Sequence, residues 1–150
     1  MKTIKVIILI VSIAISVFAQ NYTQKYNSLY QRTDFYDSYG KLIGYAKENT
    51  LYDRLEYFDA NGNLLKYEKH NNLYNRTDIY DENNNQRGYE KKNELFDRRE
   101  SFDQNNNQKG YKKWNELYQR FDVFDKYGKK IGHYKYNELY KRWDYEESAY

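Results

Sequence analysis

Residues 27–48 read Asn-Ser-Leu-Tyr-Gln-Arg-Thr-Asp-Phe-Tyr-Asp-Ser-Tyr-Gly-Lys-Leu-Ile-Gly-Tyr-Ala-Lys-Glu, and variants of this 22-residue phrase follow one another to the end of the chain. The copies open at Asn27, Asn49, Asn71, Asn93, Asn115 and Asn137. A fixed period of this length is the signature of an array of identical structural units. We therefore expect one repeat domain over residues 20–150, in which the side chains shared by every copy serve first as scaffold.

Alternating positions in the first half of each copy indicate a β-strand. Tyr30, Arg32, Asp34 and Tyr36 lie two residues apart in the first copy, and the arginine and an acidic residue recur in all six. Residues two apart on a strand point to the same face. A leucine recurs at the edge of the opposite face in every copy: Leu29, Leu51, Leu73, Leu95, Leu117 and Leu139.

A turn and a second strand follow. Asp37 is followed three residues later by Gly40, and the later copies carry Gly or Asn there, as turns that need a positive φ require. The second strand carries a recurring tyrosine and then a recurring lysine, such as Tyr45 and Lys47. The next opening Asn makes the return turn. Each copy is thus one β-hairpin, and the whole array has about twelve strands.

Charge decides how the hairpins are arranged. In a parallel solenoid equivalent residues would stack about 4.8 Å apart, and each pair of like charges would repel by roughly 3 kcal/mol at an effective dielectric of 20. An antiparallel meander separates equivalent residues by a strand. The sequence predicts an all-β fold, an elongated and largely single-layer antiparallel meander about 55 Å long. A sheet of this many strands is also prone to curl.

The register of the meander is open to one further prediction. Even loop lengths place the recurring tyrosine on the face of the arginine and the acid, which favours cation–π contacts. The same register sets lysine beside arginine within a hairpin, which is unfavourable unless the acids lie diagonally between them. The sequence alone leaves that conflict open.

The first 19 residues have the features of a secretory signal peptide. Lys2 and Lys5 precede an apolar run from Val6 to Phe18, and Ala19 and Gln20 flank the expected cleavage site. The apolar run is shorter than the roughly 20 residues of a membrane span, so we expect no stable span after removal of the signal. The chain has no cysteine, which excludes disulfides and thiolate metal sites. The sequence thus predicts a secreted, periplasmic or extracellular protein.

Two segments resemble a known repeat family. Phe35-Tyr-Asp-Ser-Tyr-Gly-Lys-Leu42 and Tyr57-Phe-Asp-Ala-Asn-Gly-Asn-Leu64 resemble the core of the YD repeats of Rhs-type secreted proteins, which are hairpin repeats of similar length. The units at 79–86 and 101–108 lack the glycine of that motif. MORN-type repeats have a comparable period. The resemblance implies a hairpin array and no particular activity.

The candidate chemical groups favour structural roles. Arg-x-Asp/Glu occurs six times, whereas an active site is singular. His70 and His133 lie at non-equivalent positions, unlike a poised catalytic histidine. Asp59-x-Asn61-x-Asn63 is similar to a calcium loop but lacks its distal bidentate acid, so we interpret it as a turn. We expect no catalytic residues, no metal and no cofactor. Basic and acidic residues number 25 and 22, a balance that argues against nucleic acid as the partner.

The aromatic side chains are the best candidates for binding, because tyrosine and tryptophan on an exposed sheet stack on sugar rings and make good protein hot spots. The candidate binding residues are Trp114, Trp143, Tyr45, Tyr67, Tyr89 and Tyr111. We therefore expect a non-enzymatic protein that binds a polysaccharide or an envelope protein through an aromatic sheet. The alternative is a structural spacer or a self-associating surface component, whose edge strands pair between molecules. Asn21 and Asn75 would be glycosylated only in a eukaryotic secretory pathway.

Overall fold

The computed structural model describes residues 21–149, which form twelve β-strands and no helix. No membrane-crossing helix therefore occurs within this range. The predicted signal peptide and its cleavage site lie outside the described residues. The strands are β1 (Tyr22–Asn27), β2 (Arg32–Asp37), β3 (Leu42–Asn49), β4 (Arg54–Asp59), β5 (Leu64–Asn71), β6 (Arg76–Asp81), β7 (Gln86–Asn93), β8 (Arg98–Asp103), β9 (Gln108–Asn115), β10 (Arg120–Asp125), β11 (Lys130–Asn137) and β12 (Arg142–Glu147).

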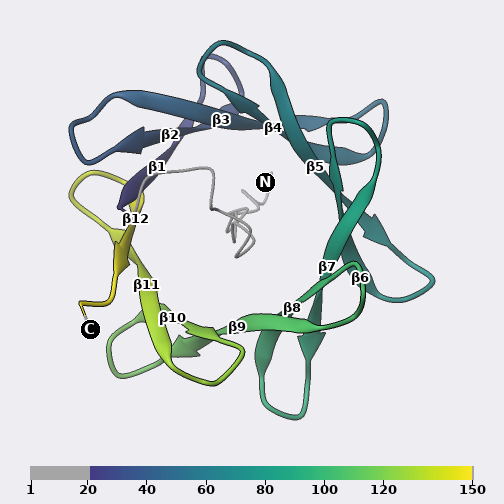
Figure 1. Cartoon of the computed structure of the whole chain (residues 1–150). Helices are drawn as coiled ribbons and strands as arrows, with labels where there is room; N and C mark the ends of the chain where they lie inside the picture. Colours follow the sequence, from purple (N-terminus) through teal and green to yellow (C-terminus); the bar gives the residue numbers. More distant parts are fainter. Residues whose placement is uncertain (1–20, 150) are drawn as a thin grey trace, which may run out of the picture.

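The twelve strands close into a barrel (Figure 1). Each strand pairs antiparallel with its sequence neighbours, as expected, and β1 also pairs with β12, with Thr23 opposite Asp144. The expectation of an elongated, open, single-layer sheet is therefore wrong. Closure gives both terminal strands a partner within the chain, which removes the free edges that intermolecular pairing would use.

A recurring irregularity explains why the sheet curls far enough to close. Five hairpins carry a β-bulge beside their Asp-x-x-Gly or Asp-x-x-Asn turn, the first between Phe35 and Tyr36. A bulge bends its strand and increases the local right-handed twist. Repeated at a fixed period, the same bend adds up around the sheet and brings β12 back to β1.

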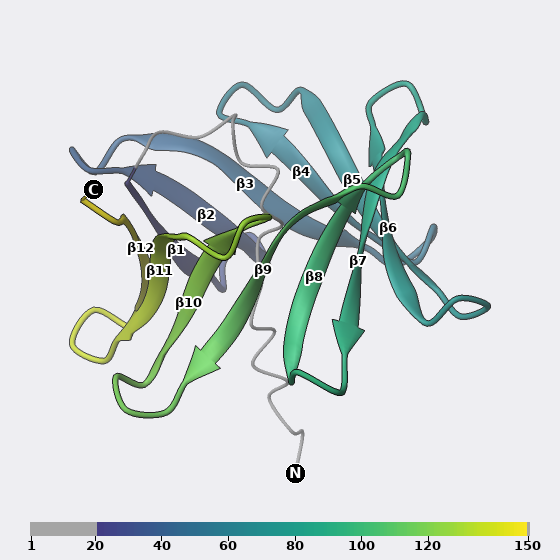
Figure 2. The same ribbon diagram turned by 60° about the horizontal axis from the view of Figure 1, so that its bottom comes forward.

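The two turn types lie at opposite ends of the barrel (Figure 2). Because the strands alternate in direction, every turn that leaves an odd-numbered strand is at one end, and every turn that leaves an even-numbered strand is at the other. The six Asn-x-Leu-aromatic turns therefore share one end. The Asp-x-x-Gly/Asn turns share the other, where Asp37 Oδ1 accepts hydrogen bonds from the backbone N–H groups of Tyr39 and Lys41.

Positive φ angles confirm the predicted turn chemistry. Gly40 has φ 80°, and Asn84 and Asn106 take the equivalent place at 65° and 64°. In the other turn type the residue before the arginine is left-handed in every copy, although none is glycine. These residues are Gln31, Asp53, Asn75, Asp97, Gln119 and Lys141.

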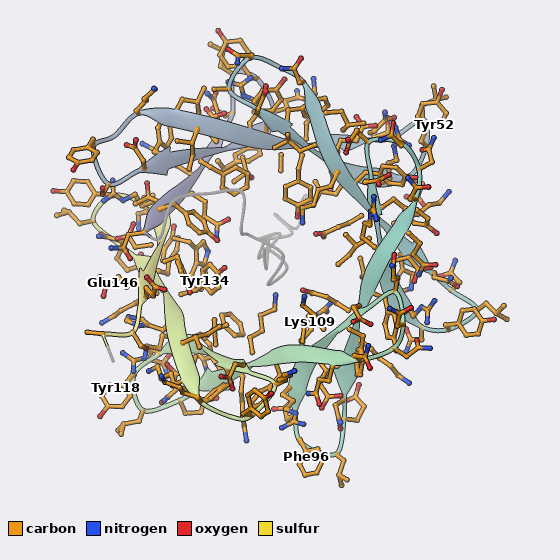
Figure 3. The ribbon with its side chains drawn as sticks, viewed as in Figure 1. Tyr52, Phe96, Lys109, Tyr118, Tyr134 and Glu146 are labelled. Carbon is orange, nitrogen blue, oxygen red and sulfur yellow. The ribbon has the colours of Figure 1, made fainter. Side chains whose placement is uncertain are left out.

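The closed sheet has an inner and an outer face. The shared Arg-acid-aromatic positions point outward, and the variable positions point inward, where Tyr22, Phe35, Tyr57, Val123 and Tyr134 belong to the buried apolar cluster. Figure 3 shows Tyr134 directed toward the barrel interior. The inward positions can differ from copy to copy because an inward side chain packs against side chains of neighbouring hairpins, as Phe35 does against Tyr22 and Tyr57.

Candidate functional site: an apolar rim at one end of the barrel

The opening asparagine holds each turn of the rim in place. Asn27 Oδ1 accepts a hydrogen bond from the Tyr30 N–H at 3.3 Å, and Asn27 Nδ2 donates to Asp34 Oδ2 at 2.7 Å. The same two bonds recur from Asn49, Asn71, Asn93, Asn115 and Asn137. The asparagine therefore fixes the turn and orients the carboxylate on the next strand.

The recurring arginine lies between two aromatic rings. The Arg32 guanidinium is 4.9 Å from the centre of the Tyr30 ring and 4.0 Å from that of Tyr45, and Arg32 Nε donates to Asp34 at 2.6 Å. The predicted cation–π contact and the structural role of the Arg-x-acid pair both follow from this geometry. In copies two to four the arginine likewise lies between two aromatic rings.

The four candidate binding tyrosines of the second strand are part of these stacks. Tyr45 also stacks on Phe58 with ring centres 4.9 Å apart. Tyr67, Tyr89 and Tyr111 stack in the same way on the aromatic residue of the next strand. Each ring therefore has an arginine on one side and an aromatic ring on another, and takes part in holding the outer face together.

The observed register also resolves the conflict between lysine and arginine. Lys25 lies directly opposite Asp34, and Lys47 lies opposite Glu56 in the next pair of strands. A lysine can therefore have an arginine opposite it on one neighbouring strand and an acid opposite it on the other. Lys135, for example, lies opposite Arg120 of β10 and opposite Asp144 of β12. Each acid is flanked by two basic groups, which offsets the repulsion between them.

Six leucines and six aromatic residues at the turn tips are exposed. The leucines are 80–84% exposed and the aromatic residues 52–58%. Figure 3 shows Tyr52, Phe96 and Tyr118 at the periphery, directed away from the barrel interior. We call this set the apolar rim: Leu29, Tyr30, Leu51, Tyr52, Leu73, Tyr74, Leu95, Phe96, Leu117, Tyr118, Leu139 and Tyr140.

The leucines of the apolar rim are not explained by folding. Each aromatic residue has its arginine 4.7–5.0 Å away, but a side chain with four fifths of its surface in water packs on little. We expected the leucines at the edge of the strand face opposite the Arg-acid positions, and the structure places them in the turns instead. The same exposed leucine stands at the tip of the turn in every copy, which makes the apolar rim the candidate contact surface of the barrel.

The charges around the apolar rim nearly balance. A belt of exposed lysines lies on the strands that lead into the rim, two residues before each opening Asn: Lys25, Lys47, Lys69, Lys91, Lys113 and Lys135. The turns, together with the residue just before each opening Asn, add Lys92 and Lys141 and the acids Glu48, Asp53, Glu94, Asp97, Glu116 and Glu138. Eight basic side chains thus stand against six acidic ones. Electrostatic attraction to an anionic surface is therefore secondary to apolar contact.

The two candidate tryptophans lie with the inward-facing residues. Trp114 packs edge-on against Phe121 with ring centres 4.8 Å apart, and Trp143 lies 5.3 Å from Tyr136. Trp143 also packs against the buried apolar cluster. The structure therefore separates the tryptophans from the four outward-facing tyrosines, with which they share no surface.

The inner face also carries buried charges that the sequence analysis did not single out. Glu90 and Lys112 are 5% and 2% exposed, and their charged atoms are 3.6 Å apart. Burial raises the pKa of Glu90 and lowers that of Lys112. On the outer face, at the place that a tyrosine takes in the other copies, His133 is 3.6 Å from Glu146, and its pKa is lowered, chiefly by burial. Residues 21–149 contain no cluster of three or more metal-ligating side chains.

Comparison with known proteins gives a likeness of fold. No family model and no curated protein matches the chain. The structure is similar to the X-ray structure of a protein from Arabidopsis thaliana, AT5G01750, with a TM-score of 0.62 over 85% of this chain and 80% of that one. The two sequences are 11% identical, so the likeness concerns the fold alone. The resemblance to YD repeats stays a prediction.

Proposed function

We propose that this protein is a non-enzymatic, peripheral binding protein that docks on a lipid membrane surface through its apolar rim. The observation that carries the proposal is the exposure of the same leucine, by 80% or more, in all six copies. The proposal keeps the binding role expected from the sequence, and it keeps export from the cytoplasm as its setting. It moves the contact surface from the sheet face to one end of the barrel.

Repetition around a closed ring favours a lipid partner. The six Leu-aromatic tips, five with tyrosine and one with Phe96, repeat nearly the same chemistry around the barrel, which suits a surface that is itself uniform. A polysaccharide chain is linear and would meet only some of the tips. A folded protein partner would need matching six-fold repetition. Many weak equivalent contacts to one surface also add up by effective concentration.

The residue types suit the interface of a bilayer. Tyrosine is favoured where an apolar ring meets a wet, polar layer. A leucine gains about 1–2 kcal/mol when most of its exposed surface leaves water, so six leucines provide enough for reversible attachment. The lysine belt would lie at the level of the headgroups, where each lysine adds about 1 kcal/mol on anionic lipid. The acidic turns offset most of that gain.

Vesicle co-sedimentation tests the proposal. Purified protein is mixed with zwitterionic phosphatidylcholine vesicles and with vesicles that contain phosphatidylserine, and the bound fraction is measured. The test variant is the triple change Leu29→Ser, Leu73→Ser and Leu117→Ser, which alters every second tip. Its matched control is Tyr39→Ser with Tyr127→Ser, because these tyrosines are 95% and 83% exposed at the opposite end of the barrel.

We expect binding to both kinds of vesicle, with a modest preference for the anionic one. The leucine triple variant should lose at least a hundredfold in partition coefficient, because each lost leucine costs about tenfold, and the tyrosine control should bind like the unaltered protein. Equal binding by all three proteins, or no binding to either vesicle, would overturn the proposal. Retention on a polysaccharide column that the leucine changes abolish would instead favour the sugar partner.

A further inference from the structure

Three basic side chains lie opposite one another on the inner face of the barrel. Arg99 of β8 is the cross-strand partner of both Lys92 of β7 and Lys112 of β9. Arg99 is two residues before the buried Ser101, so it points to the same face. Like charges in cross-strand pairs destabilise a sheet, and the equivalents of Arg99 in the other copies are uncharged: Thr33, Leu55, Thr77, Phe121 and Trp143. The row of three charges is therefore a feature of this part of the barrel and not of the repeat.

Arg99 is also the most loosely paired arginine. Its Nη1 is 4.0 Å from Glu90 Oε2, and this is its one ion pair within residues 21–149. The carboxylate is shared, because Lys112 Nζ lies 3.6 Å from the same oxygen. Each of the other seven arginines has a carboxylate oxygen within 2.9 Å. A guanidinium carries five N–H donors, so Arg99 can donate to a further acceptor.

Arg99 and Lys92 can be reached from outside the barrel. Their side chains are 38% and 54% exposed. Both lie beside the apolar rim, because Lys92 directly precedes the opening Asn93, and Arg99 is the second residue of β8. The turn between them carries the exposed Leu95 and Phe96. An anion that meets the two basic groups therefore lies at the end of the barrel and needs no space within it.

The acids near Lys92 leave it able to bind another anion. Lys92 Nζ is 2.8 Å from Glu94 Oε2 and 3.9 Å from Asp97 Oδ1. The side chains of these two acids are 76% and 83% exposed, and ion pairs in such exposed positions contribute little to stability. An anion that also contacts Arg99 has the advantage over them, because it is attracted by two cations at once.

We propose that Arg99 and Lys92 bind the phosphomonoester group of one lipid, such as phosphatidate, when the apolar rim docks on a membrane. The inference rests on the proposed function, because docking brings this end of the barrel to the level of the headgroups. A guanidinium donates to two phosphate oxygens in parallel, and an ammonium adds a compact charge beside it. A phosphomonoester has three terminal oxygens and about −1.5 to −2 charges, so it can accept from both side chains. A phosphodiester has fewer free oxygens and less charge.

Vesicle co-sedimentation tests the headgroup preference. Phosphatidylcholine vesicles carry the same mole fraction of either phosphatidate or phosphatidylserine, and the bound fraction of protein is measured. The test variant is Arg99→Thr, which introduces the residue found at the equivalent positions 33 and 77. The matched control is Lys91→Thr, which removes one positive charge from the exposed position next to Lys92, on the outer face of the same strand.

We expect the unaltered protein to bind phosphatidate vesicles about tenfold more tightly than phosphatidylserine vesicles, as hydrogen bonds to charged groups provide. Arg99→Thr should lose this preference and keep or raise its melting temperature, because it removes a contact between like charges. Lys91→Thr should keep the preference. Equal binding of the unaltered protein to both kinds of vesicle, a preference that survives Arg99→Thr, or equal losses in the two variants would overturn the proposal.

A titration without vesicles separates this inference from docking through the apolar rim. Dihexanoyl phosphatidate is added below its micelle concentration, inorganic phosphate is the second probe, and the heat of binding is measured. We expect saturable binding of the short-chain lipid, which Arg99→Thr weakens about tenfold, whether or not the protein binds vesicles. Equal affinity for the two probes would contradict a lipid headgroup as the ligand. Binding of neither probe would overturn the site and leave docking through the rim intact.

Discussion

Asn71 and Asp78 are seven residues apart in the chain and directly linked, with Asn71 Nδ2 donating to Asp78 Oδ2 at 2.7 Å. The oxygen of the same amide accepts from the Tyr74 N–H. One side chain thus satisfies a turn and a nearly buried carboxylate at once. This double role explains why asparagine opens every copy: an ionised aspartate cannot donate to the acid, and serine has a single oxygen for both bonds where asparagine has two separate atoms.

Replacing Asn71 with alanine should lower the free energy of unfolding by about 2–3 kcal/mol. The change removes two hydrogen bonds and leaves the carboxylate of Asp78, 3% exposed as a residue, with one donor fewer. Chemical denaturation measures the effect. The control is Asn72→Ala, at the next and exposed position of the same turn, which should change stability by less than about 0.5 kcal/mol. Equal effects of the two changes would contradict the assigned role.

Local sequence chemistry predicted most of the repeat unit. Asp37 and Gly40 gave the first turn, the alternation from Arg32 to Tyr36 gave the strand, and the cation–π contact of Arg32 with Tyr45 followed from the expected register. Closure was not predictable in this way. Closure depends on the pairing of Thr23 with Asp144, which are separated by almost the whole chain. It also depends on the sum of the bends that the bulges add. The residues of a single copy indicate neither of these.

An engineered disulfide should trap the closed barrel. The natural chain has no cysteine, so the double change Thr23→Cys and Asp144→Cys introduces one pair at cross-strand positions of β1 and β12. Oxidation should give a monomer that migrates faster on a non-reducing gel. The pair Thr23→Cys and Glu56→Cys, on strands that do not pair, should stay reduced. Disulfide-linked dimers from the first pair would indicate an open sheet with edges that meet between molecules.

Acid should weaken the fold through the Asp turns. Burial opposes ionisation of Asp81, but hydrogen bonds from Asn85 and Arg87 outweigh it and lower its pKa to about 2. A carboxyl group with a lowered pKa in the folded state contributes stability that is present above its unfolded value, about 4, and is lost as the pH falls toward 2. The midpoint of urea denaturation should therefore drop between pH 4 and pH 2. Asp81→Asn should drop less over that window, and an identical pH profile would count against this account.

The leucines of the apolar rim should be dispensable for stability. Leu73 is 82% exposed, so Leu73→Ser should shift the free energy of unfolding by less than about 0.5 kcal/mol. Leu55→Ser is the comparison, because Leu55 packs against the buried apolar cluster and its loss should cost about 2–4 kcal/mol. Thermal and urea unfolding of both variants measure the difference. A large loss in Leu73→Ser would return the leucines to a scaffold role.

The site was harder to predict than the fold, for a physical reason. Leu29 fits the two-residue alternation that continues into the strand, and it was expected at the edge of the face opposite the Arg-acid positions for that reason. The signal that could have placed it was Asn27, two residues earlier, whose side chain turns the chain before the strand begins at Arg32. The buried Glu90 and Lys112 were missed because their position holds no constant residue type, being Ala46, Glu68 or Tyr134 in the other copies, and has no motif of its own.

The most direct test of docking through the apolar rim is to place one environment-sensitive fluorophore at either end of the cysteine-free chain. Leu73→Cys and Tyr39→Cys are each labelled with nitrobenzoxadiazole and titrated with phosphatidylserine-containing vesicles. We predict that emission from position 73 shifts to the blue and brightens, because that tip enters the lipid, while emission from position 39 stays unchanged. A shift at position 39 alone, equal shifts at both positions, or no change at either would contradict the account.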